Sequence, residues 1–170
     1  MYEKIPHELK ELDQWCCFRI EQVANGRFTK RPYNPITNDM AKSNDDSTWV
    51  TFEEAYKNSK NYDGIGFFFK QPYVGIDLDK VENEIQEYLE NPNTDNIIGE
   101  FINVLETYAE ISPSGTGIHL ITKGKLPPKG RRRGNVEIYD TGRFFTMTGK
   151  HIGGYTVSYT HLRAHETRHD

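Results

Sequence analysis

The chain of 170 residues carries a formal net charge of −4, and its length suggests one domain with a core large enough to fold alone. The mild acidity argues against a protein that binds nucleic acid through bulk positive charge, although local basic patches remain compatible with binding. Apolar residues make up 35% of the chain and aromatic residues 12%, so much of the core is expected to be aromatic. There is no signal-peptide pattern and no long apolar run, which predicts a cytoplasmic protein and argues against membrane insertion.

The first predicted elements are two strands at 14–20 and 28–32. The turn Ala24-Asn25-Gly26 between them predicts a hairpin. Cys16 and Cys17 are adjacent in the first strand, so their side chains diverge and a mutual disulfide is excluded. We therefore expect reduced thiols.

A capping box at Thr51 and Glu54 predicts the start of a short helix. Strands are expected at 64–69 and 73–79, joined by a tight turn at Gln71-Pro72. This part of the chain therefore predicts a helix followed by two consecutive strands.

Two helical stretches follow, and the first ends at Asn91-Pro92. Their apolar faces are expected to consist of Val81, Ile85, Tyr88 and Leu89 in the first helix, and of Ile97, Ile98, Phe101, Val104 and Leu105 in the second. The remaining strands are expected at 108–111, 117–122, 135–139 and 144–148. Together these elements predict an α+β domain, with a mostly antiparallel sheet and helices packed on it.

Asp77 and Asp79 lie two residues apart in a strand-like run, so both carboxylates project from one face of the strand. Ile76 and Leu78 then point into a core. Two like charges held so close repel each other, and folding alone gives no reason to keep them together. A divalent cation does, because its charge offsets the repulsion and it prefers oxygen ligands.

Two further segments follow this acidic pair. The glycine-rich run 112–119 ends in His119, and the run 136–145 contains Glu137. In this order the segments resemble the motifs of the archaeo-eukaryotic primase superfamily, and most closely those of the primase-polymerase domains of phage and plasmid replication proteins. The resemblance extends over residues 9–149, and its N-terminal half rests on Trp15, Lys30-Arg31-Pro32, Asn44-Asp45 before Trp49, and the run 63–67.

The resemblance implies an RRM-like primase-polymerase core and a nucleotidyltransferase activity. Such a DNA primase or polymerase extends a primer or an initiating nucleotide from nucleoside triphosphates on a single-stranded DNA template. It also implies that Asp77, Asp79 and Glu137 are catalytic ligands of Mg²⁺ or Mn²⁺. From the residues alone, Glu137 fits a solvent-facing strand position equally well, and Asp140 is a substitute ligand, although its place before Thr141-Gly142 favours a turn.

In the family that the chain resembles, the histidine corresponding to His119 contacts the triphosphate of the incoming nucleotide. The turn before it can expose backbone N–H groups to phosphate oxygens, and the expected nucleotide-binding residues there are Ser114, Gly115 and Gly117. The turn lacks the Lys-Ser/Thr ending of a P-loop. Arg143 is expected to bind the β- or γ-phosphate through its guanidinium group. The alternative for His119 is a partly buried core histidine.

Template contacts are expected from the local basic residues Lys30, Arg31, Arg131, Arg132 and Arg133. Basic runs in loops are also common as solvated surface. The expected partners are single-stranded DNA, nucleoside triphosphates and a helicase domain in the same natural polypeptide, with no membrane.

Two other functions remain open. A metal-dependent relaxase or endonuclease on a related fold is disfavoured, because relaxases need a His-hydrophobic-His pair and His119 has no histidine two residues away. A catalytically inactive single-strand-binding module of a replication helicase would need aromatic and cationic residues rather than a carboxylate cluster.

Residues 157–170 resemble a translated transposon-type sequencing adapter, and three of the six histidines lie there. We therefore expect a primase-polymerase domain at 1–156, truncated at its C-terminus, and an artefactual tail at 157–170. A tail without docking contacts is expected to leave stability unchanged when it is removed. A genuine histidine-rich metal-binding tail is the alternative.

Overall fold

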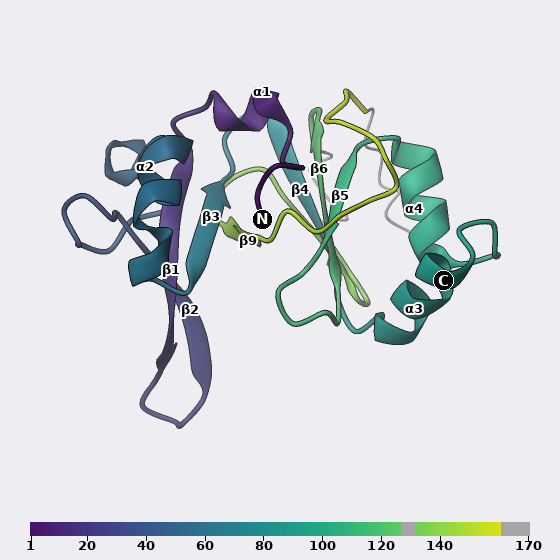
Figure 1. Ribbon diagram of the computed structural model, residues 1–170, viewed down its shortest axis with the longest axis horizontal. Helices are drawn as coiled ribbons and strands as arrows, with labels where there is room; N and C mark the ends of the chain where they lie inside the picture. Colours follow the sequence, from purple (N-terminus) through teal and green to yellow (C-terminus); the bar gives the residue numbers. More distant parts are fainter. Residues whose placement is uncertain (127–131, 161–170) are drawn as a thin grey trace.

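The computed structural model of the chain describes residues 1–126 and 132–160, and for residues 132 and 133 it describes only the backbone. Two antiparallel sheets lie side by side, with helices packed on them (Figure 1). The predicted α+β class is therefore confirmed. The helices are α1 (His7–Lys10), α2 (Phe52–Asn58), α3 (Glu82–Glu90) and α4 (Ile97–Leu105).

The first sheet has the strand order β2-β1-β3-β9. Its strands are β1 (Trp15–Gln22), β2 (Phe28–Tyr33), β3 (Gly64–Phe68) and β9 (Phe144–Met147). The predicted hairpin is confirmed, because β1 pairs with β2 and Gly26 adopts the left-handed φ of +83° that the turn requires. The capping box is confirmed as well, since Thr51 and Glu54 bond reciprocally at the start of α2.

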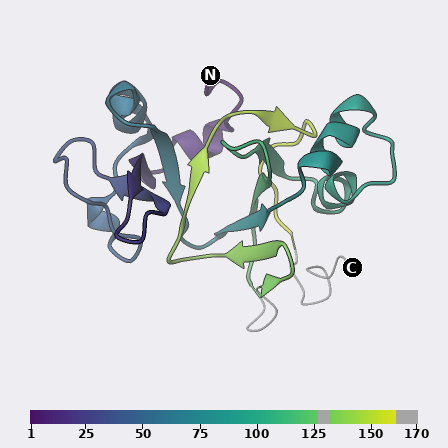
Figure 2. The ribbon, with the colours of Figure 1, turned by 90° about the horizontal axis from the view of Figure 1, so that it is seen from below.

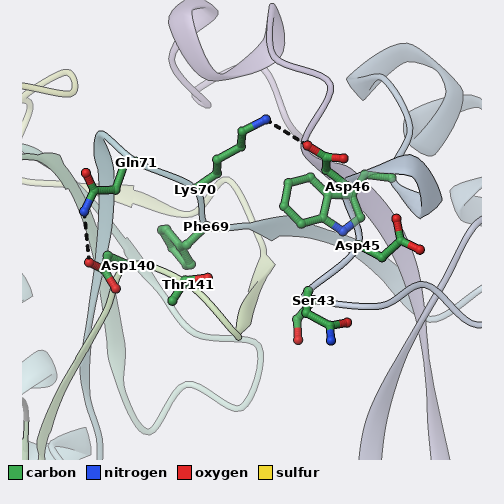
Figure 3. A pocket seen from close by; sticks show the side chains of 10 residues that line it. Ser43, Asp45, Asp46, Phe69, Lys70, Gln71, Asp140 and Thr141 are labelled. Atoms are coloured by element: carbon green, nitrogen blue, oxygen red, sulfur yellow. Dashed lines mark hydrogen bonds and ion pairs between the residues drawn. The ribbon is translucent and has the colours of Figure 1, made fainter.

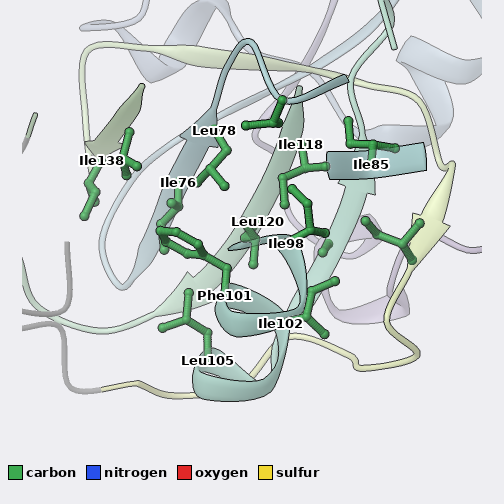
Figure 4. Close-up of a cluster of buried hydrophobic side chains, with 14 of the residues drawn as sticks. Ile76, Leu78, Ile85, Ile98, Phe101, Ile102, Leu105, Ile118, Leu120 and Ile138 are labelled. Carbon is green, nitrogen blue, oxygen red and sulfur yellow. The ribbon is translucent and has the colours of Figure 1, made fainter. Parts of the chain in front are cut away.

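The second sheet has the strand order β10-β5-β6-β4-β8-β7. Its strands are β4 (Tyr73–Leu78), β5 (Tyr108–Ile111), β6 (Ile118–Lys123), β7 (Arg132–Arg133), β8 (Val136–Tyr139) and β10 (His151–Ile152). One face of this sheet packs on α3 and α4 (Figure 4). Ile76 and Leu78 lie in that core, as predicted, with 1% and 0% of their surface exposed.

The two strands predicted on either side of Gln71-Pro72 exist, but they do not form a hairpin. β3 belongs to the first sheet and β4 to the second, so the short connection between them passes from one sheet to the other. The reason is that each strand has both neighbours already: β3 pairs with β1 and β9, and β4 with β6 and β8. After β8 the chain passes back to the first sheet (Figure 2).

The helical faces differ from the prediction at two positions. Leu89 is 50% exposed and Val104 is 63% exposed, whereas Ile102 is buried. The buried residues of α4 follow the i, i+3, i+4, i+7 spacing of one helix face, which turns Val104 toward solvent; they are Ile98, Phe101, Ile102 and Leu105, with Gly99 beside them.

The buried carboxylate of Glu110 bonds the residues after β9 to the second sheet. Glu110 of β5 accepts hydrogen bonds from Tyr108 Oη at 2.7 Å, from Thr148 N at 2.6 Å and Oγ1 at 3.0 Å, and from Gly149 N at 3.2 Å. Burial raises the pKa of Glu110, and these donors oppose that shift by stabilising the charged form. The segment after β9 is therefore held against β5.

Cys16 and Cys17 are free and buried, as predicted. No helix in residues 1–126 or 132–160 combines the length and the apolar content that crossing a bilayer requires.

The expectation of an undocked tail is wrong for residues 157–160. Val157 is 5% exposed and lies in a core cluster to which both sheets contribute. Ser158 and Thr160 exchange backbone hydrogen bonds with Lys123, both at 2.8 Å, and Ser158 N donates to Thr107 Oγ1 at 3.0 Å. Residues 157–160 thus bury one valine and form backbone hydrogen bonds beside β6. The composition of the segment does not predict these contacts. The adapter origin stays a prediction, and residues 161–170 lie outside the described part of the chain.

Ending the chain at Thr156 should therefore lower the free energy of unfolding by about 1–3 kcal/mol relative to a chain ending at Thr160. The loss combines one buried valine with several hydrogen bonds, reduced by the entropy of ordering the segment. Urea denaturation of the two chains measures the difference. Equal midpoints would show that these contacts contribute nothing and would restore the original expectation.

Candidate active site

Three neighbouring strands of the second sheet bring Asp77, His119 and Glu137 together. Asp77 on β4 lies directly opposite His119 on β6 and directly opposite Glu137 on β8. Cross-strand partners project from the same face of a sheet. Asp77 Oδ1 is 3.6 Å from His119 Nε2. Three motifs that are separated in the sequence thus place their side chains in one row across the sheet.

This row lies on the face of the second sheet opposite α3 and α4. Gly75 precedes it on the same face, and a Cβ atom there would lie 2.4 Å from the ring of Phe69 and 2.7 Å from that of Phe145. Only glycine therefore lets the two rings cover β4. Phe145 in turn stacks on His119, with ring centroids 4.2 Å apart and an interplanar angle of 18°.

A pocket of about 390 Å³ opens over Asp77 and His119 of this row, with Glu137 outside its lining, and has walls from both sheets. The second sheet contributes Asp77, His119 and Tyr139, and the first sheet contributes its edge strand β2 and the start of β9. The lining residues from the first sheet and from the turn before β9 are Phe28, Thr29, Lys30, Arg143, Phe144, Phe145 and Thr146.

Lys30 and Arg31 project from opposite faces of β2. Lys30 lines the pocket, whereas Arg31 Nε lies 3.4 Å from the carboxylate of Glu21. Strand alternation predicts that the two side chains diverge. It could not say which of them faces the carboxylates, because that depends on how the first sheet sits against the second.

The charges around Asp77 act on one another. Burial, followed by the charges of Asp79 and Glu137, raises the pKa of Asp77 to about 6, and Lys30 and Arg143 oppose the shift. Burial also lowers the pKa of Lys30, against the attraction of Asp77 and Asp79. Burial is thus the main cause of both shifts, and the surrounding charges modify it.

His119 is neutral at physiological pH. Burial, and then the positive charge of Lys30, lower its pKa to about 4. A neutral imidazole has one donor and one acceptor nitrogen, so it can donate a hydrogen bond without carrying charge. His119 is only 8% exposed, so the alternative of a buried core histidine is correct about its burial. That alternative does not explain why the side chain lines the pocket.

Asp79 lies at the rim rather than inside the pocket. It follows the end of β4, it is exposed, and its Oδ1 accepts a hydrogen bond from Lys80 N at 2.9 Å. Its charge nevertheless reaches Asp77. The acidic pair thus shares a face, as predicted, but only one member lies deep in the site.

The glycine-rich turn at Ser114, Gly115 and Gly117 packs beside this rim and does not line the pocket. A Cβ atom on Gly117 would lie 2.4 Å from Leu78 O, so glycine is needed for close approach to β4. Ser114 Oγ lies 2.7 Å from Thr116 Oγ1 within the turn. The nucleotide-binding role of these residues stays a prediction.

Arg143 lies in the pocket, and its guanidinium carbon is 4.9 Å from the centre of the Tyr139 ring. The aromatic face orients the cation and leaves its N–H groups available to an anion. The other predicted cations cannot be placed. Arg131 lies outside the described residues, and the side chains of Arg132 and Arg133 are likewise not described.

A second pocket of about 400 Å³ contains Asp140, the substitute for Glu137 (Figure 3). Gln71 Nε2 donates to Asp140 Oδ2 at 3.4 Å, and on the opposite wall Lys70 Nζ lies 2.9 Å from Asp46. The structure therefore places Glu137 opposite Asp77 and Asp140 in a separate pocket.

The donor set suits a hard divalent cation, since Asp77 and Glu137 lie opposite each other and supply carboxylate oxygens, with Asp79 close enough for its charge to act on Asp77. Within residues 1–126 and 132–160, no three His, Cys, Asp or Glu side chains already converge to hold a metal ion. The case for a metal ion here therefore rests on the carboxylate oxygens available and on the strand register that places Asp77 opposite Glu137.

Sequence reasoning missed the aromatic and hydroxyl residues of the pocket. Phe28, Thr29, Phe144 and Thr146 line it. Their own side chains carry no charge that would signal a site, and they reach the pocket only because the first sheet folds against the second.

No protein-family model matches the chain. Over 156 residues it is 32% identical to the DNA primase-polymerase of Nitratiruptor phage NrS-1. The match covers 86% of this chain and 20% of that protein, so the chain spans about a fifth of its relative's length. The similarity confirms the resemblance to a phage primase-polymerase that the motifs predicted.

Replacing Asp77 by asparagine should leave the unfolding temperature unchanged or raise it by a few degrees at pH 8 in the presence of a chelator. The pKa of Asp77, raised to about 6, means that the folded state disfavours the ionised carboxylate. This penalty is absent below the ordinary value of 3.8 and complete above 6, so the advantage of the variant should grow as the pH rises between them.

Thermal melts of wild type, Asp77→Asn and the exposed control Asp39→Asn between pH 4 and pH 8 test this. A variant that melts several degrees below wild type at pH 8 would show that attractive partners hold the carboxylate.

Proposed function

We propose that this chain is a nucleotidyltransferase domain of a DNA primase-polymerase, which joins nucleotides from nucleoside triphosphates to a primer or an initiating nucleotide. The observation that carries the proposal is that Asp77 and His119 share one pocket with Lys30 and Arg143, while Glu137 lies opposite Asp77 on the next strand, outside the pocket lining. The relative's name supports the same activity. No observation favours a relaxase or an inactive binding module.

Asp77 and Glu137, with Asp79 at the rim, are the proposed ligands of Mg²⁺ or Mn²⁺. When bound, such an ion activates the attacking hydroxyl and offsets the charge that develops on the transferred phosphate. The carboxylates supply the oxygen donors, and burial together with the charges of Asp79 and Glu137 raises the pKa of Asp77. A divalent cation is the ligand that this arrangement favours.

Lys30 and Arg143 are the proposed partners of the triphosphate. Both line the pocket on the side opposite the carboxylate row. A guanidinium group binds phosphate oxygens through two parallel hydrogen bonds, and an ammonium group adds a compact charge. His119, neutral at physiological pH, adds an uncharged hydrogen-bond donor. Together these groups supply the positive charge and the hydrogen-bond donors that a leaving pyrophosphate needs.

The proposed template is single-stranded DNA, with Arg131, Arg132 and Arg133 as candidate contacts. Arg132 and Arg133 form β7, which pairs with β8. A helicase domain in the same natural polypeptide is a further proposal. It is supported by the resemblance and by the length of the relative, of which this chain spans 20%.

Primer extension and priming without a primer test the activity. Each assay uses deoxynucleotides and ribonucleotides in turn, with Mg²⁺ and Mn²⁺ compared. We expect Asp77→Asn and Glu137→Gln to lose at least about 100-fold in incorporation, the scale on which removal of a preorganised charge lowers a rate. Asp39→Asn should match wild type. If wild type gives no product under any condition, the chain is a binding module instead.

Lys30 and Arg31 form a matched pair, because they are adjacent but project from opposite faces of β2. Lys30→Ala should weaken nucleoside triphosphate binding about tenfold or more, whereas Arg31→Ala should change it less than twofold, since exposed ion pairs contribute little. Fluorescence titration with a labelled nucleotide measures both. Equal losses in the two variants would mean that the effect is general surface charge rather than a triphosphate contact.

A further inference from the structure

Phe28 is a large aromatic side chain that the fold does not use. The residue is 70% exposed, although it lies on β2 beside residues that line the pocket. In the described part of the chain, the aromatic pairs of the two cores do not include it. Exposing so much apolar surface is unfavourable, and such residues commonly mark a binding surface.

The position of Phe28 relative to the charges is fixed by strand geometry. Phe28 and Lys30 are two residues apart and therefore share the face of β2 that looks into the pocket. At the usual rise of a strand, their Cα atoms are about 7 Å apart. The pocket thus has cations and carboxylates toward Lys30 and Asp77, and an aromatic wall that begins one step along β2.

A nucleoside triphosphate has the same division, with a polyanion at one end, a sugar, and a flat base at the other. We propose that Phe28 binds the base of the incoming nucleoside triphosphate by stacking, while Lys30 holds its phosphates. This inference rests on the proposed nucleotidyltransferase function and adds the residue that recognises the base. Phe28 donates no hydrogen bond through its side chain, so the contact accepts any base.

The chain offers a matched control on the same face of the hairpin. Ile20 lies directly opposite Lys30 on β1, and it is 51% exposed, but it does not line the pocket. Ile20→Ala therefore removes a comparable exposed apolar side chain without touching the proposed base site.

The test is equilibrium binding of the four nucleoside triphosphates and of inorganic tripolyphosphate to wild type, Phe28→Ala, Phe28→Trp and Ile20→Ala. Phe28→Ala should weaken all four nucleotides by about 5- to 100-fold, the range expected for one base stacked on one ring. It should leave tripolyphosphate affinity within twofold of wild type. Phe28→Trp should retain nucleotide binding, and Ile20→Ala should resemble wild type in every titration.

Three outcomes would overturn the inference. One is unchanged nucleotide affinity in Phe28→Ala. Another is an equal loss for tripolyphosphate, which would indicate a disturbed phosphate site. The third is a loss confined to a single-stranded oligonucleotide, which would place the ring on the template. If wild type binds neither nucleotides nor tripolyphosphate, the proposed function itself fails, and that result is distinct from the other three.

Discussion

The pairing of β4 with both β6 and β8 is the constraint on which the site depends. Because Asp77 is opposite His119 on one side and opposite Glu137 on the other, all three side chains must project from one face. A slip of one residue in either pairing would turn one member into the helix-covered core. The apolar partners Ile76 and Leu78 enforce the register, since that slip would also drive a carboxylate against α3 and α4. Stability and site geometry are therefore set by the same alternation.

The packing of the two sheets against each other gives the pocket its second wall. At Gly75 the missing side chain leaves room for Phe69 and Phe145, which belong to the connection after β3 and to β9. These rings fill the junction between the sheets, and Phe145 also covers one face of His119. The hydrogen bonds that Glu110 accepts from Thr148 and Gly149 hold the segment after β9 in place. One edge of the first sheet is thus anchored to the second, and the face of β2 that carries Lys30 can form the opposite wall of the pocket.

Local patterns predicted the hairpin, the capping box, the strand alternation at Asp77 and the order of the motifs, because each depends on neighbours in the sequence. They did not predict that β3 and β4 separate into two sheets, since a turn signal specifies a bend and not the partner of a strand. For the same reason, the sequence could not distinguish Lys30 from Arg31 or assign any role to Phe28. The spacing of Asp77 and Asp79 and the glycines of the turn around Gly117 predicted site positions for both segments, whereas neither Asp79 nor Gly117 lines the pocket. The docking of Val157 was missed because a single apolar residue has no periodicity.

β2 is an edge strand, with β1 on one side and no further strand beyond it in the sheet of β1, β3 and β9. An exposed edge carries unpaired backbone groups that can template pairing with a second chain, and proteins protect such edges with charged residues and proline. Lys30 and Arg31 are residues of this kind, and at the end of β2 the segment at Met40 and Ala41 covers the edge, with Ala41 N donating to Pro32 O at 3.0 Å. The composition of this short segment is therefore constrained by solubility as well as by ligand binding. Substitutions that make it more apolar and β-branched would promote aggregation, even when the pocket keeps its shape.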